Sequence, residues 1–297
     1  MNNLVKRLSV FCLLLITLAA CKKETSTITP DPEPKTEPPG TNNPPPPASN
    51  NPWDNVVETT KTTQKGITVN VNANIGGYLQ ALPALYDSTS KRYPLILFLH
   101  GVGELGNGST QLSNAAACGV PNVIKWNSFP ANFVSNGKNY SFIVITPQFK
   151  AWPSPADVND MLNYTISKYR IDTTRMYLSG LSMGGGVTWE YDAVYPKRIA
   201  ATVPICGASG PTDAKAQKIA QANLPVWAFH NEDDPTVTVN NSKGYVSKIN
   251  TYNPNPAAKL TLWPTGGHDS WTKATDPSFK ENGMNIYEWM LQYTRNN

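Results

Sequence analysis

The stretch Ser-Gly-Leu-Ser-Met-Gly-Gly-Gly at residues 179–186 constrains the fold more than any other part of the sequence. Its Gly180-Leu181-Ser182-Met183-Gly184 core fits the pattern G-x-S-x-G. A strand-like apolar run (175–180) precedes the serine, and a helical pattern (183–195) follows it. Glycine is costly at a helix start unless the backbone needs its freedom. The pattern therefore predicts a sharp strand-to-helix turn that presents the Ser182 hydroxyl as a nucleophile. A purely structural glycine turn is the alternative.

Short apolar runs alternate with helical patterns along the rest of the chain. Residues 93–101 and 140–148 are continuous apolar runs, as expected for strands buried on both faces. Residues 154–169 begin with Ser154 and Pro155, a typical helix start. Residues 67–83 alternate in polarity and predict an antiparallel hairpin. The other expected elements are strands 199–207, 224–234 and 258–270 and helices 214–222, 240–251 and 283–293. This order predicts an α/β fold with a mostly parallel, doubly wound sheet and helices on both faces.

The first 52 residues are not expected to join that fold. Residues 1–20 have a basic start and an apolar run, which predicts a signal peptide that is too short to be a stable membrane span. Cys21 follows two alanines in a stretch that resembles a bacterial lipobox, so we expect it to carry lipid. Residues 21–52 are rich in proline and threonine and predict a disordered, extended tether. We expect residues 53–297 to form one catalytic domain.

Charge and cysteine content give little further direction. The formal net charge is +4, and no run of lysine or arginine indicates nucleic-acid binding. The histidines and cysteines show no metal-ligand spacing, so we expect neither a metal nor another cofactor. Cys118 and Cys206 would face an oxidising compartment, but the sequence cannot decide whether they pair. Oligomeric state is equally open, and a monomer is the simplest expectation.

The chain has three histidines, and all three lie at or just beyond the end of an expected strand. Ligands bind beyond the carboxyl ends of the strands in such a sheet. His268 follows the last strand on a glycine-rich loop and is the best candidate for a base that reaches Ser182. His230 is better explained as a packing residue or a support for the site. His100 is better explained as an anchor for the loop that follows it.

A serine nucleophile also needs an orienting carboxylate and two oxyanion donors. The acid is expected from the loop after strand 224–234. Asp234, which precedes Pro235, is preferred, while Asp233 and Glu232 stay possible. The N–H of Met183 is one expected oxyanion donor. The N–H of Val102, after His-Gly, is the other, with Gly103 as its substitute.

Six segments together resemble a known family of secreted esterases with the α/β-hydrolase fold. This group includes feruloyl and acetyl-xylan esterases, polyhydroxybutyrate depolymerase-like proteins and enzymes often named predicted peptidases. The resemblance covers about residues 66–293 and implies Ser182 as nucleophile, Asp234 as acid and His268 as base. One departure is Asn231, which stands where the family usually has glycine. The matching segments are YPLILFLHGVGELGNG, FIVITPQ, YRIDTTRMYLSGLSMGGG, AATVPICG, LPVWAFHNEDDPTV and GGHDSW.

The expected activity is hydrolysis of carboxylic esters through an acyl-enzyme, with feruloyl or acetyl groups on polysaccharides as substrates. Candidates for substrate contact are Trp271, Trp152, Glu104 and Gln148, and a further candidate is Trp126. The lipid anchor would place the protein in the outer membrane, facing the periplasm or the cell surface. A serine peptidase on the same fold and a non-catalytic binding lipoprotein are the alternatives.

Overall fold

The structure is a computed structural model that describes residues 56–295. The expected signal peptide, the lipidated Cys21 and the tether all lie outside the described residues, as do the first three residues of the expected domain. No helix within the described part is long and apolar enough to cross a bilayer.

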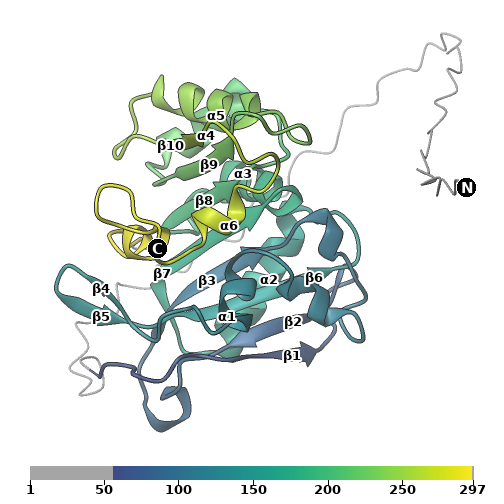
Figure 1. Cartoon of the computed structure of the whole chain (residues 1–297), viewed down its shortest axis with the longest axis vertical. Helices are drawn as coiled ribbons and strands as arrows, with labels where there is room; N and C mark the ends of the chain where they lie inside the picture. Colours follow the sequence, from purple (N-terminus) through teal and green to yellow (C-terminus); the bar gives the residue numbers. More distant parts are fainter. Residues whose placement is uncertain (1–55, 296–297) are drawn as a thin grey trace, which may run out of the picture. The chain divides into compact units, whose positions relative to one another are not determined.

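An eight-stranded mixed sheet runs through the described part in the order β1-β2-β6-β3-β7-β8-β9-β10 (Figure 1). The antiparallel hairpin of β1 and β2 forms one end, and β2 also pairs antiparallel with β6. All the remaining neighbours are parallel. The strands are β1 (Gln64–Thr68), β2 (Ile75–Ala81), β3 (Tyr93–Leu99), β6 (Ile143–Phe149), β7 (Ile171–Leu181), β8 (Ala201–Ile205), β9 (Trp227–Asn231) and β10 (Lys259–Trp263). The predicted α/β architecture is confirmed.

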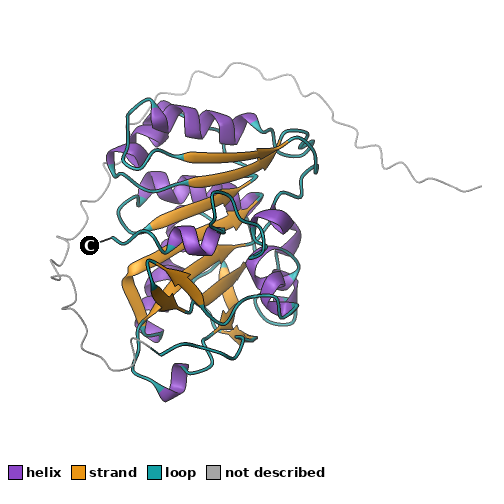
Figure 2. Cartoon of the chain, turned by 60° about the vertical axis from the view of Figure 1, so that its left-hand side comes forward, coloured by secondary structure: helices purple, strands orange, loops and turns teal. Residues whose placement is uncertain are grey.

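Helices cover both faces of this sheet (Figure 2). One face carries α2 (Pro155–Lys168), α3 (Met183–Val194), α4 (Asp213–Gln221) and α5 (Asn240–Asn250), whose apolar side chains share one core with Leu95, Leu97 and Leu99. The other face carries α1 (Gly119–Lys125), α6 (Trp271–Ala274) and α7 (Ile286–Met290), which pack with Ile96 and Phe98. Alternate residues of β3 therefore serve opposite cores, which explains why its sequence is apolar throughout.

The expected start of α2 is confirmed in detail. The Ser154 hydroxyl accepts a hydrogen bond from the N–H of Asp157, and the Asp157 carboxylate accepts one from the N–H of Ser154. This reciprocal pair satisfies two of the amides that a helix start leaves without partners. Expected strand 224–234 proved too long, because β9 ends at Asn231 and leaves Glu232, Asp233 and Asp234 on a loop.

A helix and a hairpin that were not expected lie between β3 and β6. The stretch 117–133 contains α1, and a small separate hairpin follows it, formed by β4 (Phe133–Ser135) and β5 (Lys138–Tyr140). Asn136 and Gly137 link these two strands with φ values of 49° and 72°. Asn-Gly is the preferred pair for such a two-residue turn, so the sequence did hold a signal for this hairpin.

Candidate active site

Ser182 occupies the tight turn between β7 and α3. Its backbone lies at φ 53° and ψ −115°, a conformation that costs energy for any residue other than glycine. Gly180 allows the turn to close, because a β-carbon there would lie 2.6 Å from the carbonyl carbon of Gly184. The predicted strand-to-helix turn is present, and its strained backbone is held by the packing described next.

The three glycines after Met183 let the first turn of α3 lie directly on other backbone segments. A β-carbon at Gly184 would lie 2.1 Å from the Leu99 carbonyl oxygen at the end of β3. At Gly185 it would lie 2.4 Å from the carbonyl oxygen of Ile205 at the end of β8, and at Gly186 it would lie 2.6 Å from that of Ala208. Each of these distances is shorter than any real carbon contact, so a side chain at any of the three positions would push the helix away from the sheet.

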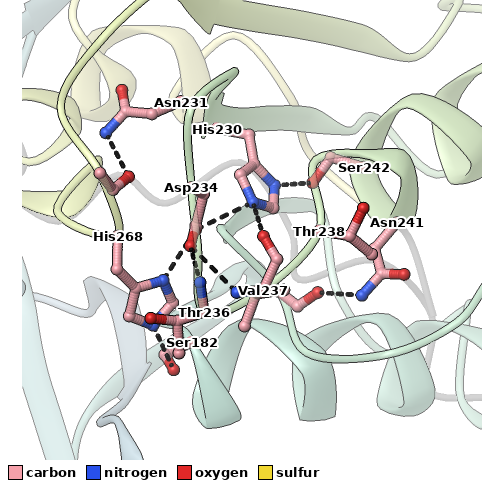
Figure 3. Close-up of polar contacts among 12 residues, drawn as sticks. Ser182, His230, Asn231, Asp234, Thr236, Val237, Thr238, Asn241, Ser242 and His268 are labelled. Carbon is pink, nitrogen blue, oxygen red and sulfur yellow. Dashed lines mark hydrogen bonds and ion pairs between the residues drawn. The ribbon is translucent and has the colours of Figure 1, made fainter.

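His268 links Ser182 to Asp234 in a continuous hydrogen-bonded chain (Figure 3). Its Nε2 lies 2.8 Å from the Ser182 Oγ, and its Nδ1 lies 2.7 Å from the Asp234 Oδ2. A carboxylate can only accept, so Nδ1 carries the proton and Nε2 accepts from the serine hydroxyl. The imidazole is therefore in the state that can take a proton from Ser182.

Asp234 is buried but well satisfied. Its side chain has no exposed surface, and its Oδ1 accepts the N–H groups of Thr236 and Val237 at 2.8 and 3.0 Å. Burial alone would raise the pKa of Asp234, but the hydrogen bonds from His268 and from these amides outweigh it and hold the pKa below its usual value. The carboxylate is thus ionised and can stabilise a charged imidazole.

The other two candidates for the acid, Glu232 and Asp233, have partners other than His268. Glu232 forms a surface ion pair with Lys243 at 3.0 Å. Asp233 accepts backbone hydrogen bonds from Gly266 and Gly267. Of the three acidic residues on this loop, only Asp234 contacts the ring of His268.

His230 supports Asp234 from the side opposite His268 (Figure 3). Its Nε2 lies 3.2 Å from the Asp234 Oδ2 and 3.0 Å from the carbonyl oxygen of Val237. Because both partners are acceptors, Nε2 must carry the proton, and Nδ1 then accepts from the Ser242 hydroxyl at 2.8 Å. Burial lowers the pKa of His230, which favours this neutral form.

His100 anchors the loop beside Ser182. Its Nδ1 donates to the carbonyl oxygen of Gly101 at 2.7 Å, and its Nε2 accepts the N–H of Phe149 at 3.1 Å. A β-carbon at Gly101 would lie 3.7 Å from the Ser182 β-carbon, so this loop and the serine are in contact. Among the hydrogen bonds of residues 56–295, none uses the N–H of Val102 or Met183. Both expected oxyanion donors therefore lie next to the serine in sequence or in space and are uncommitted.

The four residues expected to contact substrate divide into two kinds. The Trp271 ring meets the His268 ring edge-to-face at 5.2 Å, and Trp152 is 54% exposed on the loop after β6. Trp271 therefore lies beside the ring of His268, and substrate contact by either tryptophan stays a prediction. Trp126, at the end of α1, is also highly exposed.

Glu104 and Gln148 occupy positions that do not suit substrate contact, which corrects that expectation. The Glu104 carboxylate is buried and accepts the N–H of Gly101 at 2.6 Å. Gln148 has no exposed surface, and its amide bonds the backbone of Glu104, Gly108 and Gln111. The polar groups of both side chains form hydrogen bonds with the backbone of the loop after β3, and these bonds hold the loop in shape.

Cys118 and Cys206 are free thiols in the structure. Burial raises the pKa of Cys206 to about 12, so its thiol stays protonated. Together with Asp234 and His268, it offers a ligand atom within 4.8 Å of the other two. A protonated thiol and a carboxylate that is already bonded to the imidazole make a poor donor set for a cation. The expected lack of a metal stays a prediction.

The model of the phospholipase/carboxylesterase family matches residues 81–276, which include every residue of the hydrogen-bonded chain described above. The chain belongs to this family. It accordingly has the α/β-hydrolase fold, as the resemblance in the sequence predicted.

Three similar proteins help to place this member of the phospholipase/carboxylesterase family. It is 28% identical over 162 residues to the bifunctional acetylxylan esterase/xylanase XynS20E of Neocallimastix patriciarum, covering 52% of this chain and only 21% of that protein. A solved thermostable esterase has a TM-score of 0.54 at 23% identity, over 80% of this chain and 64% of the other. A ferulic acid esterase has a TM-score of 0.51 at 15% identity, over 71% and 93%. At these identities the two solved structures show the shared fold.

The neutral state of His100 predicts how the stability of this protein depends on pH. Burial lowers the pKa of His100 to about 4, although its bond to Gly101 opposes this, and an unfolded histidine titrates near about 6.5. Between pH values of about 4 and about 6.5, His100 therefore binds a proton in the unfolded chain but not in the folded one. The free energy of unfolding therefore falls as the pH falls through this window, by about 3 kcal/mol from His100. Urea unfolding at a series of pH values gives the free energy of unfolding against pH for each protein. This free energy should fall less steeply with falling pH in His100→Gln than in the wild type.

His230 contributes to the same slope with the same sign, because burial lowers its pKa too. Val194→Ala serves as the control, since Val194 is exposed and the change removes no titratable group, so the wild-type pH dependence should be kept. Equal slopes for His100→Gln and wild type would contradict the assignment of His100 as a neutral anchor.

Proposed function

We propose that this protein is a serine esterase that cleaves carboxylic esters through an acyl-enzyme, with Ser182, His268 and Asp234 as its catalytic triad. The observation that supports this best is the hydrogen-bonded chain from the Ser182 hydroxyl through both nitrogens of His268 to a buried, ionised Asp234. Membership of the carboxylesterase family agrees with this chemistry.

In the first half of the proposed reaction, His268 Nε2 takes the proton of Ser182 as Oγ attacks the carbonyl carbon of the ester. The imidazolium that forms is stabilised by Asp234 through Nδ1–H. The N–H groups of Met183 and Val102, or Gly103, receive the developing negative charge on the carbonyl oxygen. His268 then gives its proton to the leaving alcohol, and the acyl group remains on Ser182.

In the second half, water replaces the alcohol. His268 takes a proton from the water as it attacks the acyl carbon, and the same two N–H groups hold the second oxyanion. Collapse of this intermediate returns the proton from His268 to Ser182 and releases the carboxylic acid. No group besides the triad and the backbone amides is needed for either step.

For the substrate class, we propose esters attached to carbohydrate. Trp271 and the exposed Trp152 offer flat apolar surfaces that suit sugar rings or aromatic acyl groups. A shallow, open depression of about 460 Å³ lies along the loop after β3, and its polar side chains suit sugar hydroxyls. Its lining consists of Leu105, Gly106, Asn107, Gln111 and Lys150. The relative named as an acetylxylan esterase supports the same class.

We further propose that Cys21 carries a lipid that anchors the protein in the outer membrane, facing the periplasm or the cell surface. The basic start, the apolar run and the Leu-Ala-Ala-Cys sequence support the anchor. The proline-rich residues 22–52 would then act as a spacer between the membrane and the hydrolase domain. The esterase would work there as a monomer.

Loss of the nucleophile is the first test. Ser182→Ala should lower kcat on p-nitrophenyl acetate by about 10⁴-fold or more, since no other side chain can take its place. Asp234→Asn should lower it by about 10³- to 10⁴-fold, because Nδ1 would lose its anionic acceptor. A fluorophosphonate probe should label the wild type and not Ser182→Ala. Near wild-type turnover in Ser182→Ala would refute the proposal, and an unlabelled wild type would favour a non-catalytic binding protein.

Trp271 gives a test of the substrate class. Acetylated xylan and methyl ferulate should be hydrolysed faster than a matched p-nitrophenyl ester of a long fatty acid. Trp271→Ala should raise KM for the carbohydrate-linked esters by about 10-fold, because it removes an aromatic contact worth about 1 kcal/mol or more. Val194→Ala, an exposed change at the far end of α3, is the control. Faster turnover of peptide bonds than of any ester would favour the serine-peptidase alternative.

The anchor can be tested separately. In cells fed a labelled fatty acid, the wild type should carry the label and sediment with outer membranes, and Cys21→Ser should lose the label. Cys12→Ser, which keeps Cys21, should behave like the wild type. An unlabelled wild-type protein in the soluble fraction would exclude lipidation.

A further inference from the structure

The residues just before His268 are attached to the rest of the molecule through two side chains. Asp233 accepts the N–H of Gly266 at 3.2 Å and the N–H of Gly267 at 2.8 Å. Asn231 donates its side-chain amide to the carbonyl oxygen of Gly267 at 3.0 Å (Figure 3). Within residues 56–295, these are the hydrogen bonds that residues 264–267 make.

This loop needs external attachment because its own backbone is permissive. Gly266 has a φ of 146° and Gly267 a φ of 59°, conformations that glycine enters and leaves readily. Gly266 also rests on the side chain of Asn231, since a β-carbon there would lie 2.4 Å from the Asn231 Nδ2. Two consecutive glycines directly before His268 would otherwise let the imidazole drift.

We propose that Asn231 and Asp233 are positioning residues, which clamp the Gly266–Gly267 backbone so that His268 stays aligned with Ser182 and Asp234. This inference rests on the proposed function, because it assigns a role in placing the catalytic base. Asn231 and Asp233 touch neither the reacting atoms nor the His268 ring.

The clamp follows from how β9 and β10 end. The two strands are parallel neighbours, with Asn231 opposite Trp263, so the loops that follow them leave the sheet side by side. The short segment 231–234 then holds the His268 loop at three points. Asp234 accepts a hydrogen bond from the His268 ring, while Asn231 and Asp233 bond the backbone of the two glycines just before it. The acid and the base are therefore placed by one segment, and their separation does not depend on the glycines.

The two clamp residues differ in environment, and this sets what each substitution would do. Asn231 is 2% exposed, and its amide group faces a carbonyl oxygen. Asn231→Asp keeps the shape but replaces the donor by an acceptor, so two oxygens would repel each other. Asp233 is exposed, and Asp233→Asn keeps one oxygen that can accept one of the two N–H groups. Asp233→Ala removes both bonds.

The experiment measures kcat and KM separately on p-nitrophenyl acetate for Asn231→Ala, Asn231→Asp, Asp233→Ala and Asp233→Asn. A misplacement of a catalytic group by about 1 Å can cost about 100-fold in rate. We expect kcat to fall about 10- to 100-fold in Asn231→Ala, Asn231→Asp and Asp233→Ala, with KM within about twofold of wild type. Asp233→Asn should recover part of the loss.

Glu232→Ala is the matched control. Glu232 stands between the two clamp residues, is exposed, and bonds Lys243 rather than the His268 loop. Its kcat should equal that of the wild type. Amide hydrogen exchange gives a second readout, because the N–H groups of Gly266 and Gly267 should exchange faster in Asp233→Ala than in the wild type or in Glu232→Ala.

The outcomes separate this inference from the proposed function. If Ser182→Ala is inactive while all four clamp variants keep kcat within about twofold of wild type, the clamp is wrong and the triad stands. Equal exchange of the two glycine amides in Asp233→Ala and wild type would also overturn the clamp. If Ser182→Ala keeps its activity, the proposed function itself fails.

Discussion

The contact between the first turn of α3 and the ends of β3 and β8 is the constraint on which the site depends. Three glycines bring the helix backbone against the carbonyl oxygens of Leu99, Ile205 and Ala208. This contact holds Ser182 in its strained conformation and directs its hydroxyl away from the sheet. It also brings the loop after β3 next to the serine, because a β-carbon at Gly101 would lie 3.7 Å from that of Ser182. Backbone packing alone thus sets the conformation of Ser182 and the position of the loop beside it.

Around that turn, three histidines at one sheet edge perform different tasks because their partners differ. His100 donates from Nδ1 and accepts at Nε2, which ties a loop to β6. His230 donates from Nε2 to Asp234 and Val237 and is fully buried. His268 has the same tautomer as His100, but 20% of its side chain is exposed, and its free nitrogen faces a hydroxyl. Of the three imidazoles, His268 is therefore the one whose surroundings suit the proton transfer that we propose.

The elements of the main sheet and the members of the hydrogen-bonded chain could be predicted because their signals are local. Apolar runs mark the buried strands, Ser154 marks a helix start, and the pattern around Ser182 requires one kind of turn. Chain order then placed Asp234 and His268 at the same edge. Side-chain direction could not be predicted in this way. Glu104 and Gln148 lie close to that edge in sequence, yet their polar groups turn back onto the loop backbone.

The roles of Asn231 and Asp233 were also missed, although the sequence held a signal for them. Two glycines before the expected base form a segment without intrinsic rigidity, and such a segment needs partners elsewhere. The sequence presents Asp233 only as a rival to Asp234, because a carboxylate in this loop first suggests the acid of the triad. Its actual bonds depend on how the loops after β9 and β10 meet, which no local pattern reveals.

The position of β10 at the border of the sheet has a consequence for how the enzyme would lose activity. Ser182 leaves a central strand with neighbours on both sides, whereas His268 follows a border strand that pairs only with β9. Local openings of elements with fewer contacts cost less than complete unfolding, and β10 has a neighbouring strand on one side only. Such an opening would withdraw the imidazole of His268 while Ser182, the proposed nucleophile, stays in place. The molecule would then pass through a folded but inactive form before the sheet as a whole comes apart.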